Sequence, residues 1–196
     1  MTTIVAVRKG DRVVIAADSQ STFGDTRVDA QFDAQPDKIF QSCDSYFGIS
    51  GAAAHDLVLQ GALAQTENLD FHSRATIFNS FRQLHKALKQ DYFLRPDEED
   101  GDPYESSHFT ALIANSQGIF GVFSMREVYE YNRFWAIGSG REFALGAMQA
   151  VYDDGEMEAE AIARLGVSVG CQFDIGSTLP MTVYCLPLEG GNGEQR

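Results

Sequence analysis

The chain has 196 residues, of which 44% are hydrophobic and 22% are charged. This length suits one domain, or two very small ones, and the hydrophobic content is too high for a disordered chain. The 28 acidic side chains outnumber the 15 basic ones, giving a net charge of −13. That balance argues against nucleic acid or an anionic membrane as the main partner, because phosphate binding needs clustered Lys and Arg.

No run of residues approaches the ~20 consecutive apolar residues that a membrane span requires. The first ten residues also lack the basic lead of a signal peptide and the small-residue cleavage site that follows its apolar core. We therefore expect a cytoplasmic protein.

The cysteines and histidines do not form ligand patterns. The cysteines are widely spaced without a CxxC pair, and we predict reduced thiols that act as small buried side chains. No histidine lies in an HExxH or similar arrangement, so we predict no metal site and no cofactor. The residues concerned are Cys43, Cys171, Cys185, His55, His72, His85 and His108.

The first half of the chain is predicted to form strands and then helices. Two Val- and Ile-rich runs flank Lys9-Gly10-Asp11, which is typical of a β-hairpin. Residues 19–37 are polar and rich in turn residues, and are predicted to be a loop. The further expected elements are strands over 39–41 and 46–49 and helices over 52–66 and 73–92. The apolar face of the last helix comprises Ile77, Phe81, Leu84 and Leu88, and its expected N-cap is Ser73.

The second half repeats this order after an interruption. Residues 95–107 are predicted to form a solvated acidic loop, because the regular ligand spacing of a calcium site is absent. The expected strands cover 108–114, 118–124, 127–131, 134–137 and 181–187. One helix is expected after Gly138-Ser139-Gly140, with Phe143, Ala144, Ala147, Met148 and Val151 facing inward, and another over 157–170. Residues 188–196 are predicted to be a flexible tail.

The order of elements favours an α+β fold. Strands that follow one another in blocks favour antiparallel sheets over a repeated βαβ pattern, and paired helices can cover each outer face. A four-layer α-β-β-α sandwich in a single domain over 1–196 fits this order. Periodicity alone would not select it over other α+β arrangements.

Thr2 is the first candidate for chemistry. If Met1 is removed on maturation, an N-terminal threonine carries a nucleophile and a base in one residue, since its α-amine can accept the proton of its hydroxyl. That amine titrates near ~8, so part of it is neutral at cytosolic pH. Thr after Met is common by chance, and this signal alone is weak.

The residues around it make a more specific pattern. The stretch from Thr2 to Asp18, then Lys38-Ile39, Gly48-Ile49-Ser50-Gly51 and Ala136 to Ala147, resembles the proteasome-like N-terminal-nucleophile hydrolases, HslV above all. The resemblance covers about residues 1–60 and 135–180. Taken singly, Asp18 and Lys38 suit a surface ion pair, Gly51 a turn and Ser139 a helix N-cap. Their joint occurrence in family order favours the family.

The resemblance implies the fold described above and a role for each residue. Thr2 would attack the peptide carbonyl, Lys38 would stabilise the alkoxide, and Asp18 would hold Lys38. The N–H of Gly51 would face the oxyanion. Ser139, Asp174 and Ser177 would orient the threonine amine. Positions that line the first specificity pocket in relatives are Ser21, Pro36, Ile49 and Ala53, which predict a medium-sized apolar pocket.

Several features depart from HslV. The segment between Asp18 and Lys38 is four residues longer, the oxyanion turn reads Gly51-Ala52 rather than a glycine pair, and Asp174-Ile175-Gly176-Ser177 fits the proteasome pattern better. These departures favour a separate bacterial proteasome homologue, such as the betaproteobacterial type, over an HslV orthologue.

The resemblance implies a threonine endopeptidase built as a homo-oligomer of two stacked rings of six or seven subunits. It would degrade unfolded polypeptides or peptides, with an ATP-dependent unfoldase ring as a partner. Two alternatives stay open: a catalytically weak or inactive ring that serves as a scaffold or binding particle, which the Gly51-Ala52 change motivates, and an amidase for small substrates.

Overall fold

The fold is built on two large antiparallel sheets, beside a small two-stranded one. The computed structural model describes residues 1–95, 104–105, 109–124 and 127–189. The first sheet has the order β10-β1-β2-β11, and its strands are β1 (Ile4–Lys9), β2 (Arg12–Asp18), β10 (Phe134–Ile137) and β11 (Met181–Pro187). The second sheet has the order β5-β6-β7-β8-β9, and its strands are β5 (Ile39–Ser42), β6 (Ser45–Ser50), β7 (Thr110–Asn115), β8 (Gly118–Phe123) and β9 (Glu127–Tyr131).

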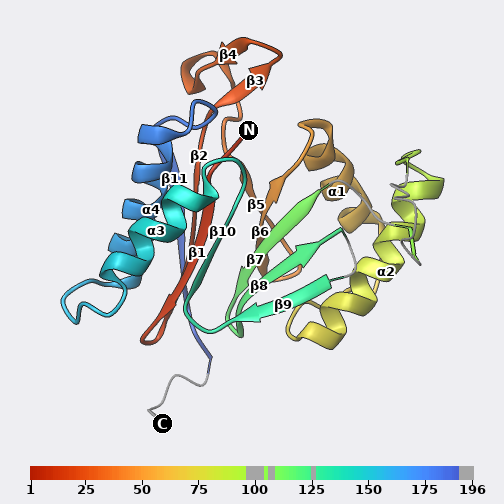
Figure 1. The fold of residues 1–196 in the computed structure, drawn as a ribbon. Coiled ribbons are helices and arrows are strands. Elements are labelled where there is room, and N and C mark those ends of the chain that lie inside the picture. Colours follow the sequence, from red (N-terminus) through yellow and green to blue (C-terminus); the bar gives the residue numbers. More distant parts are fainter. Residues whose placement is uncertain (96–103, 106–108, 125–126, 190–196) are drawn as a thin grey trace.

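Two pairs of helices cover the outer faces of these sheets (Figure 1). The pair on the second sheet is α1 (Ala54–Gln65) and α2 (Arg74–Gln90), and the pair on the first sheet is α3 (Arg141–Val151) and α4 (Ala159–Phe173). The predicted four-layer α-β-β-α sandwich is therefore confirmed. Among the described residues, no helix is long and apolar enough to cross a membrane.

Each interface between layers has its own apolar core. Strand residues alternate between faces, so Val5, Val7 and Ala16 pack against α3 and α4 while Ile4, Ala6 and Ile15 face the second sheet. The third core lies under α1 and α2 and includes the predicted face of α2, whose members Ile77, Phe81, Leu84 and Leu88 are all fully buried. Ser73 caps α2 as predicted, in a capping box with Thr76.

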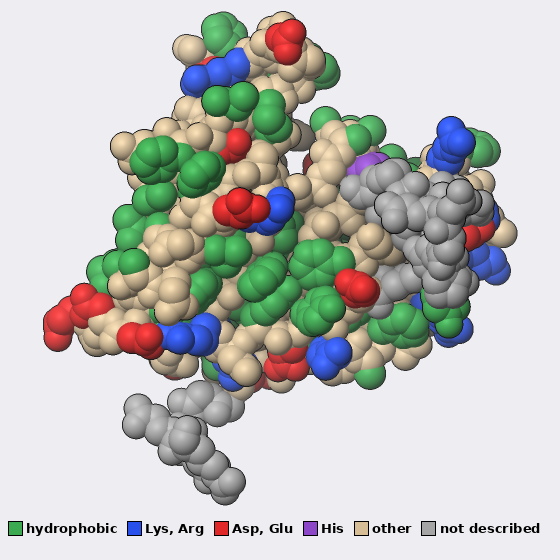
Figure 2. Space-filling model, viewed as in Figure 1, with side chains coloured by type: hydrophobic (Ala, Val, Ile, Leu, Met, Phe, Trp, Pro, Cys, Tyr) green, Lys and Arg blue, Asp and Glu red, His purple; other side chains and the backbone are tan. Residues whose placement is uncertain are grey.

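An edge of the sandwich carries aromatic side chains. Phe123, Tyr129, Tyr131 and Trp135 form a continuous row across β8, β9 and β10, with Tyr131 and Trp135 stacked at 4.6 Å between ring centroids. Hydrophobic side chains gather over this region on the face that Figure 2 shows.

The segment predicted as one loop over 19–37 contains a hairpin. Its strands are β3 (Ser21–Phe23) and β4 (Thr26–Val28), followed by a 3₁₀ turn over Ala30–Phe32. The prediction was wrong because each strand has only three residues. Their polar composition gives no apolar alternation that would indicate a strand. Gly24, at φ +56°, permits the two-residue turn between them.

Three predictions of burial were also wrong. Phe143 is 43% exposed on α3, where its ring lies 5.5 Å from that of Phe173 on the neighbouring helix. Cys43 is exposed because it lies in the turn between β5 and β6, and Cys185 is exposed on the edge strand β11. Only Cys171 is partly buried among the three.

Some predictions fall partly outside the described residues. Most of the acidic loop 95–107, His108 and residues 190–196 of the expected tail lie outside them. Of the tail, Leu188 and Glu189 are described, and their backbone N–H groups donate to the carbonyls of Asp11 and Ser116.

Candidate active site

Thr2 lies two residues before the start of β1, at the end of the sandwich where β2 ends and β5 and β11 begin (Figure 1). Its side chain is only 5% exposed. The hydroxyl donates to Oδ1 of Asp18 at 3.0 Å and accepts from Nζ of Lys38 at 3.0 Å. A hydroxyl held between a carboxylate and an ammonium is suited to carry developing negative charge on its oxygen.

Asp18 is the last residue of β2 and is 1% exposed. Besides Thr2, its Oδ1 accepts from the N–H of Thr3 at 2.9 Å and from Nζ of Lys38 at 2.8 Å. Its Oδ2 accepts backbone N–H groups of Gln20 and Thr178 at 3.0 and 3.2 Å. Because five donors surround it, this carboxylate is held in one orientation.

Lys38 reaches the site from the other sheet, because it precedes β5. Its side chain is 16% exposed. Burial lowers the pKa of Lys38 below its ordinary value, and the nearby carboxylate of Asp18 opposes that change only in part. Its ammonium also lies 3.5 Å from the carbonyl oxygen of Met1.

A second group of hydroxyls surrounds the nitrogen of Thr2. The N–H of Thr2 donates to Oγ of Ser139 at 3.1 Å, and Ser139 donates to Oδ2 of Asp174 at 2.8 Å. Ser177 donates to the same oxygen at 2.7 Å. Thr3 therefore donates to Ser177, their oxygens being 2.7 Å apart. Six of the seven predicted catalytic residues thus form one hydrogen-bonded network.

The glycines beside Ser139 permit a close approach to Thr2 and Thr3 that was not predicted from the sequence. A Cβ at Gly138 would lie 2.1 Å from the carbonyl oxygen of Thr2, and one at Gly140 would lie 2.0 Å from Oγ1 of Thr3. The N–H of Gly140 also donates to the carbonyl of Thr2 at 3.2 Å. A Gly-x-Gly pair is a recognisable signal for such contacts.

Gly51 is the seventh predicted residue, and it lies just after β6. It is exposed, and a Cβ there would lie 2.8 Å from Nδ1 of His55. The predicted pocket residues come from separate elements, with Ser21 at the start of β3, Pro36 before β5, Ile49 in β6 and Ala53 at the N-cap of α1. Ile49 packs against the core under α1 and α2. The oxyanion role and the pocket stay predictions.

Thr3 and Gln20 also belong to the site, although they were not predicted from the sequence. Gln20 is 2% exposed, and besides its N–H bond to Asp18 its Nε2 donates to the carbonyl of Ile175 at 3.1 Å. It thus joins the end of β2 to the loop that carries Asp174 and Ser177. A buried glutamine two residues after Asp18 has no pattern of its own that would have identified it.

Comparison with known proteins identifies the family. The family model "Proteasome subunit" matches residues 1–172. The chain belongs to the proteasome subunit family. An ATP-dependent protease subunit HslV from Caldicellulosiruptor saccharolyticus is 30% identical over 183 residues, which are 93% of this chain and 96% of that relative. HslV from Bartonella quintana is 28% identical and covers 96% of this chain and 90% of its own length.

Solved structures agree with this membership. Thiobacillus denitrificans BPH, a betaproteobacterial proteasome homologue, in complex with epoxomicin is 40% identical, with a TM-score of 0.88 over 95% of this chain and 98% of that chain. HslV from Trypanosoma brucei, at 23% identity and a TM-score of 0.69 over 94% and 99%, shares the fold. The chain is therefore a protease subunit of the HslV/proteasome type.

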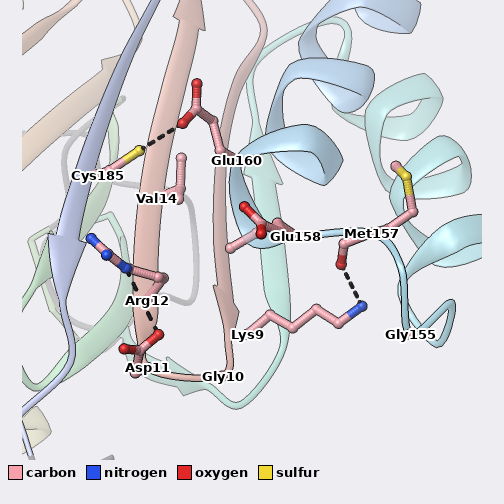
Figure 3. A pocket seen from close by; sticks show the side chains of 11 residues that line it. Lys9, Gly10, Asp11, Arg12, Val14, Gly155, Met157, Glu158, Glu160 and Cys185 are labelled. Carbon is pink, nitrogen blue, oxygen red and sulfur yellow. Dashed lines mark hydrogen bonds and ion pairs between the residues drawn. The ribbon is translucent and has the colours of Figure 1, made fainter.

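A cavity of about 520 Å³ lies elsewhere in this proteasome-family chain (Figure 3). It adjoins the β1–β2 hairpin and the start of α4, and Lys9 and Arg12 are among its lining residues. The length of β1 separates it from Thr2 by about 20 Å, at ~3.3 Å per residue. The ammonium of Lys9 already donates to the carbonyls of Asp154 and Met157. This cavity is therefore separate from the proteasome-type site.

Cys171 is the nucleophilic side chain that adjoins the site from α4. Burial and the charge of Asp18 raise its pKa to about 12. A thiol that stays protonated is a poor nucleophile, so Thr2 has no competitor in Cys171.

Proposed function

We propose that this chain is a threonine endopeptidase subunit in which Thr2 becomes the N-terminal nucleophile once Met1 is removed. The observation that carries the proposal is the position of the Thr2 hydroxyl, 3.0 Å from both the Asp18 carboxylate and the Lys38 ammonium. The bond that Thr2 N–H donates to Ser139, and the one that Ser139 donates to Asp174, support it further, because they would orient a free amine.

In the proposed reaction, the Oγ1 of Thr2 attacks the scissile carbonyl carbon, and its proton passes to the α-amine. Lys38 lowers the energy of the alkoxide, and the N–H of Gly51 stabilises the oxyanion. The amine product leaves with the proton from the α-amine, and an acyl ester remains on Thr2. Water, deprotonated by the same amine, then hydrolyses that ester.

The proposal includes a homo-oligomer of two stacked rings of six or seven subunits in the cytoplasm. Its substrates would be unfolded polypeptides or peptides with an apolar side chain in a pocket lined by Ser21, Pro36, Ile49 and Ala53. The relatives named ATP-dependent protease subunits motivate an ATP-dependent unfoldase ring as a partner. A peptide library that showed a preference for acidic side chains would contradict the apolar pocket.

Cleavage of a fluorogenic peptide with an aliphatic residue before the reporter tests this proposal. Thr2→Ala is expected to lower kcat/KM by a factor of about 10³ or more, while Thr2→Ser retains measurable cleavage because it keeps a hydroxyl. Wild-type rates in Thr2→Ala would contradict the assignment of the nucleophile.

The scaffold or binding particle remains the second candidate, because the oxyanion turn reads Gly51-Ala52 and the 19–37 segment is longer than in HslV. A Met1-free wild-type chain without any cleavage would favour it. Cleavage of small amides in preference to peptides would instead favour the amidase.

A further inference from the structure

We infer that Asp37, through Thr182 and Tyr184 of β11, is a positioning residue that sets the location of Lys38 relative to Thr2. This inference rests on the proposed function, in which Lys38 acts on the Thr2 oxygen. None of these three residues belongs to the network around Thr2 described above.

The carboxylate of Asp37 accepts three hydrogen bonds. Its Oδ1 accepts from the N–H of Ile39 at 2.9 Å and from the hydroxyl of Thr182 at 2.8 Å. Its Oδ2 accepts from the hydroxyl of Tyr184 at 2.5 Å. The bond to Ile39 encloses Lys38 in a tight turn, so a displacement of Asp37 displaces Lys38.

These bonds join the two sheets of the sandwich. Thr182 and Tyr184 are two residues apart on β11 and face the same side, whereas Asp37 precedes β5 of the other sheet. The ring of Tyr184 also stacks on that of Tyr46 in β6, with 4.7 Å between centroids. The contact is therefore held by packing as well as by hydrogen bonds.

The place of this contact explains its relevance to Lys38. Thr2 and Asp18 belong to the first sheet, and Lys38 must reach them from the second. Thr182 pairs with Ala17, the residue next to Asp18, so β11 is fixed relative to the carboxylate that Lys38 binds. Asp37 thus ties the backbone beside Lys38 to the strand beside Asp18.

The contact between Asp37 and β11 acts on Lys38 by fixing its position and not by the charge of Asp37. The Asp37 carboxylate is directed to β11, while the charged groups that act on Lys38 are Asp18 from β2 and Asp174 from the loop after α4. Cys171 on α4 is a further titratable group near Lys38, but its thiol stays protonated. After maturation, the amine of Thr2 joins them. If the tie to β11 is lost, Lys38 is free to move toward solvent, where its pKa would rise toward 10.5.

The test removes the two donors on β11 and keeps Asp37, because an Asp37 substitution would also leave the N–H of Ile39 unpaired. In the Thr182→Val/Tyr184→Phe double variant, we expect kcat for the fluorogenic peptide to fall about tenfold with KM within about twofold. The alkaline midpoint of the kcat profile should move to higher pH. Tyr152→Phe is the matched control, since its hydroxyl donates to the carbonyl of Arg8 at the far end of the sheet. It should behave as wild type.

The inference would be overturned if the double variant kept the wild-type kcat and the wild-type alkaline midpoint. It would also be overturned if Tyr152→Phe lost as much kcat as the double variant. A second readout is independent of turnover: the pH dependence of Lys38 acetylation, followed by mass spectrometry in the Thr2→Ala background. The midpoint should rise when the β11 donors are removed, and an unchanged midpoint would contradict the inference. If the wild type itself fails to cleave, the proposed function fails, and this labelling still tests the positioning.

Discussion

Lys38 combines burial with a charge that the proposed chemistry needs. Its ammonium lies 2.8 Å from Asp18 and 3.0 Å from the Thr2 hydroxyl, in a place where burial disfavours the charged form. Lys38 could be predicted from the sequence because it occurs in the order of the family pattern. Its distances to Asp18 and Thr2 could not, because they depend on the fold.

The lowered pKa of Lys38 predicts a pH dependence. The folded protein loses this proton at a lower pH than an ordinary lysine, and the ammonium stabilises the alkoxide only while it is protonated. We therefore expect kcat to fall on the alkaline side with a midpoint below 10.5. Stopped assays from pH 6 to 11 measure it.

Lys38→Arg provides the comparison for this profile. Arginine keeps its charge over the whole range, so whatever activity this variant retains should show no such alkaline fall. A wild-type midpoint at or above 10.5 would contradict the lowered pKa of Lys38, and an equal alkaline fall in Lys38→Arg would contradict its role.

Some of the remaining site residues could be predicted from the sequence and others could not. Asp18, Ser139, Asp174 and Ser177 could be predicted because their types recur in a family order. Gln20 could not, because its bonds to Asp18 and to the carbonyl of Ile175 depend on a contact between distant loops. A contact of that kind is decided by tertiary structure and not by residue type.

Helix α4 contributes to the site by how closely it approaches β1. Gly170 packs directly on Thr3, and a Cβ there would lie 2.6 Å from Cγ2 and 2.7 Å from Oγ1 of that residue. Thr3 is fully buried and donates to Ser177. The position of α4 therefore determines the loop that follows it, with Asp174 and Ser177.

Gly170→Ala is expected to displace α4 from the sheet. Overpacking of this kind destabilises by roughly 1–3 kcal/mol, and kcat should fall because Ser177 and Asp174 move with the helix. Thermal unfolding and peptide cleavage measure the two effects.

Gly146→Ala on α3 is the matched control. Within the described part of the chain, nothing apart from its own helix lies within 4 Å of a Cβ at that position, so the change should stabilise the helix by about 0.5–1 kcal/mol and leave kcat unchanged. Equal behaviour of the two variants would contradict the close packing inferred for Gly170.

Most elements could be predicted from the sequence because their periodicity is strong. The hairpin Lys9-Gly10-Asp11 and the apolar face of α2 are local patterns, and the structure confirms both. The β3–β4 hairpin is too short and polar for such a pattern. The exposure of Phe143 could not be predicted either, because it depends on the orientation of α3 beside α4.

The chain carries a net charge of −13. This charge has a larger consequence in a ring of many subunits than in a single chain. In the proposed assembly of 12 or 14 subunits, these charges add to a strong negative field. Acidic residues outnumber basic ones by 28 to 15 in the chain, and Figure 2 shows side chains of both kinds spread over one face of the subunit.

This field predicts a preference in substrate entry. Basic or neutral peptides should be cleaved faster than acidic ones of matched length and scissile residue, and the difference should shrink as salt screens the charge. Rates for charge-matched peptide pairs at about 20 and 500 mM salt, where the Debye length falls from roughly 20 to 4 Å, measure it. Equal rates at low salt would contradict the prediction.

Intact-mass analysis after treatment with a peptide epoxyketone tests the claim that Thr2 is an N-terminal nucleophile with a free amine. Ring closure on the enzyme needs both the threonine hydroxyl and its α-amine, and a related BPH structure holds epoxomicin. We predict loss of Met1 and one adduct per chain in the wild type, with no adduct in Thr2→Ala. A Met1-free wild-type chain that stays unmodified would contradict the claim.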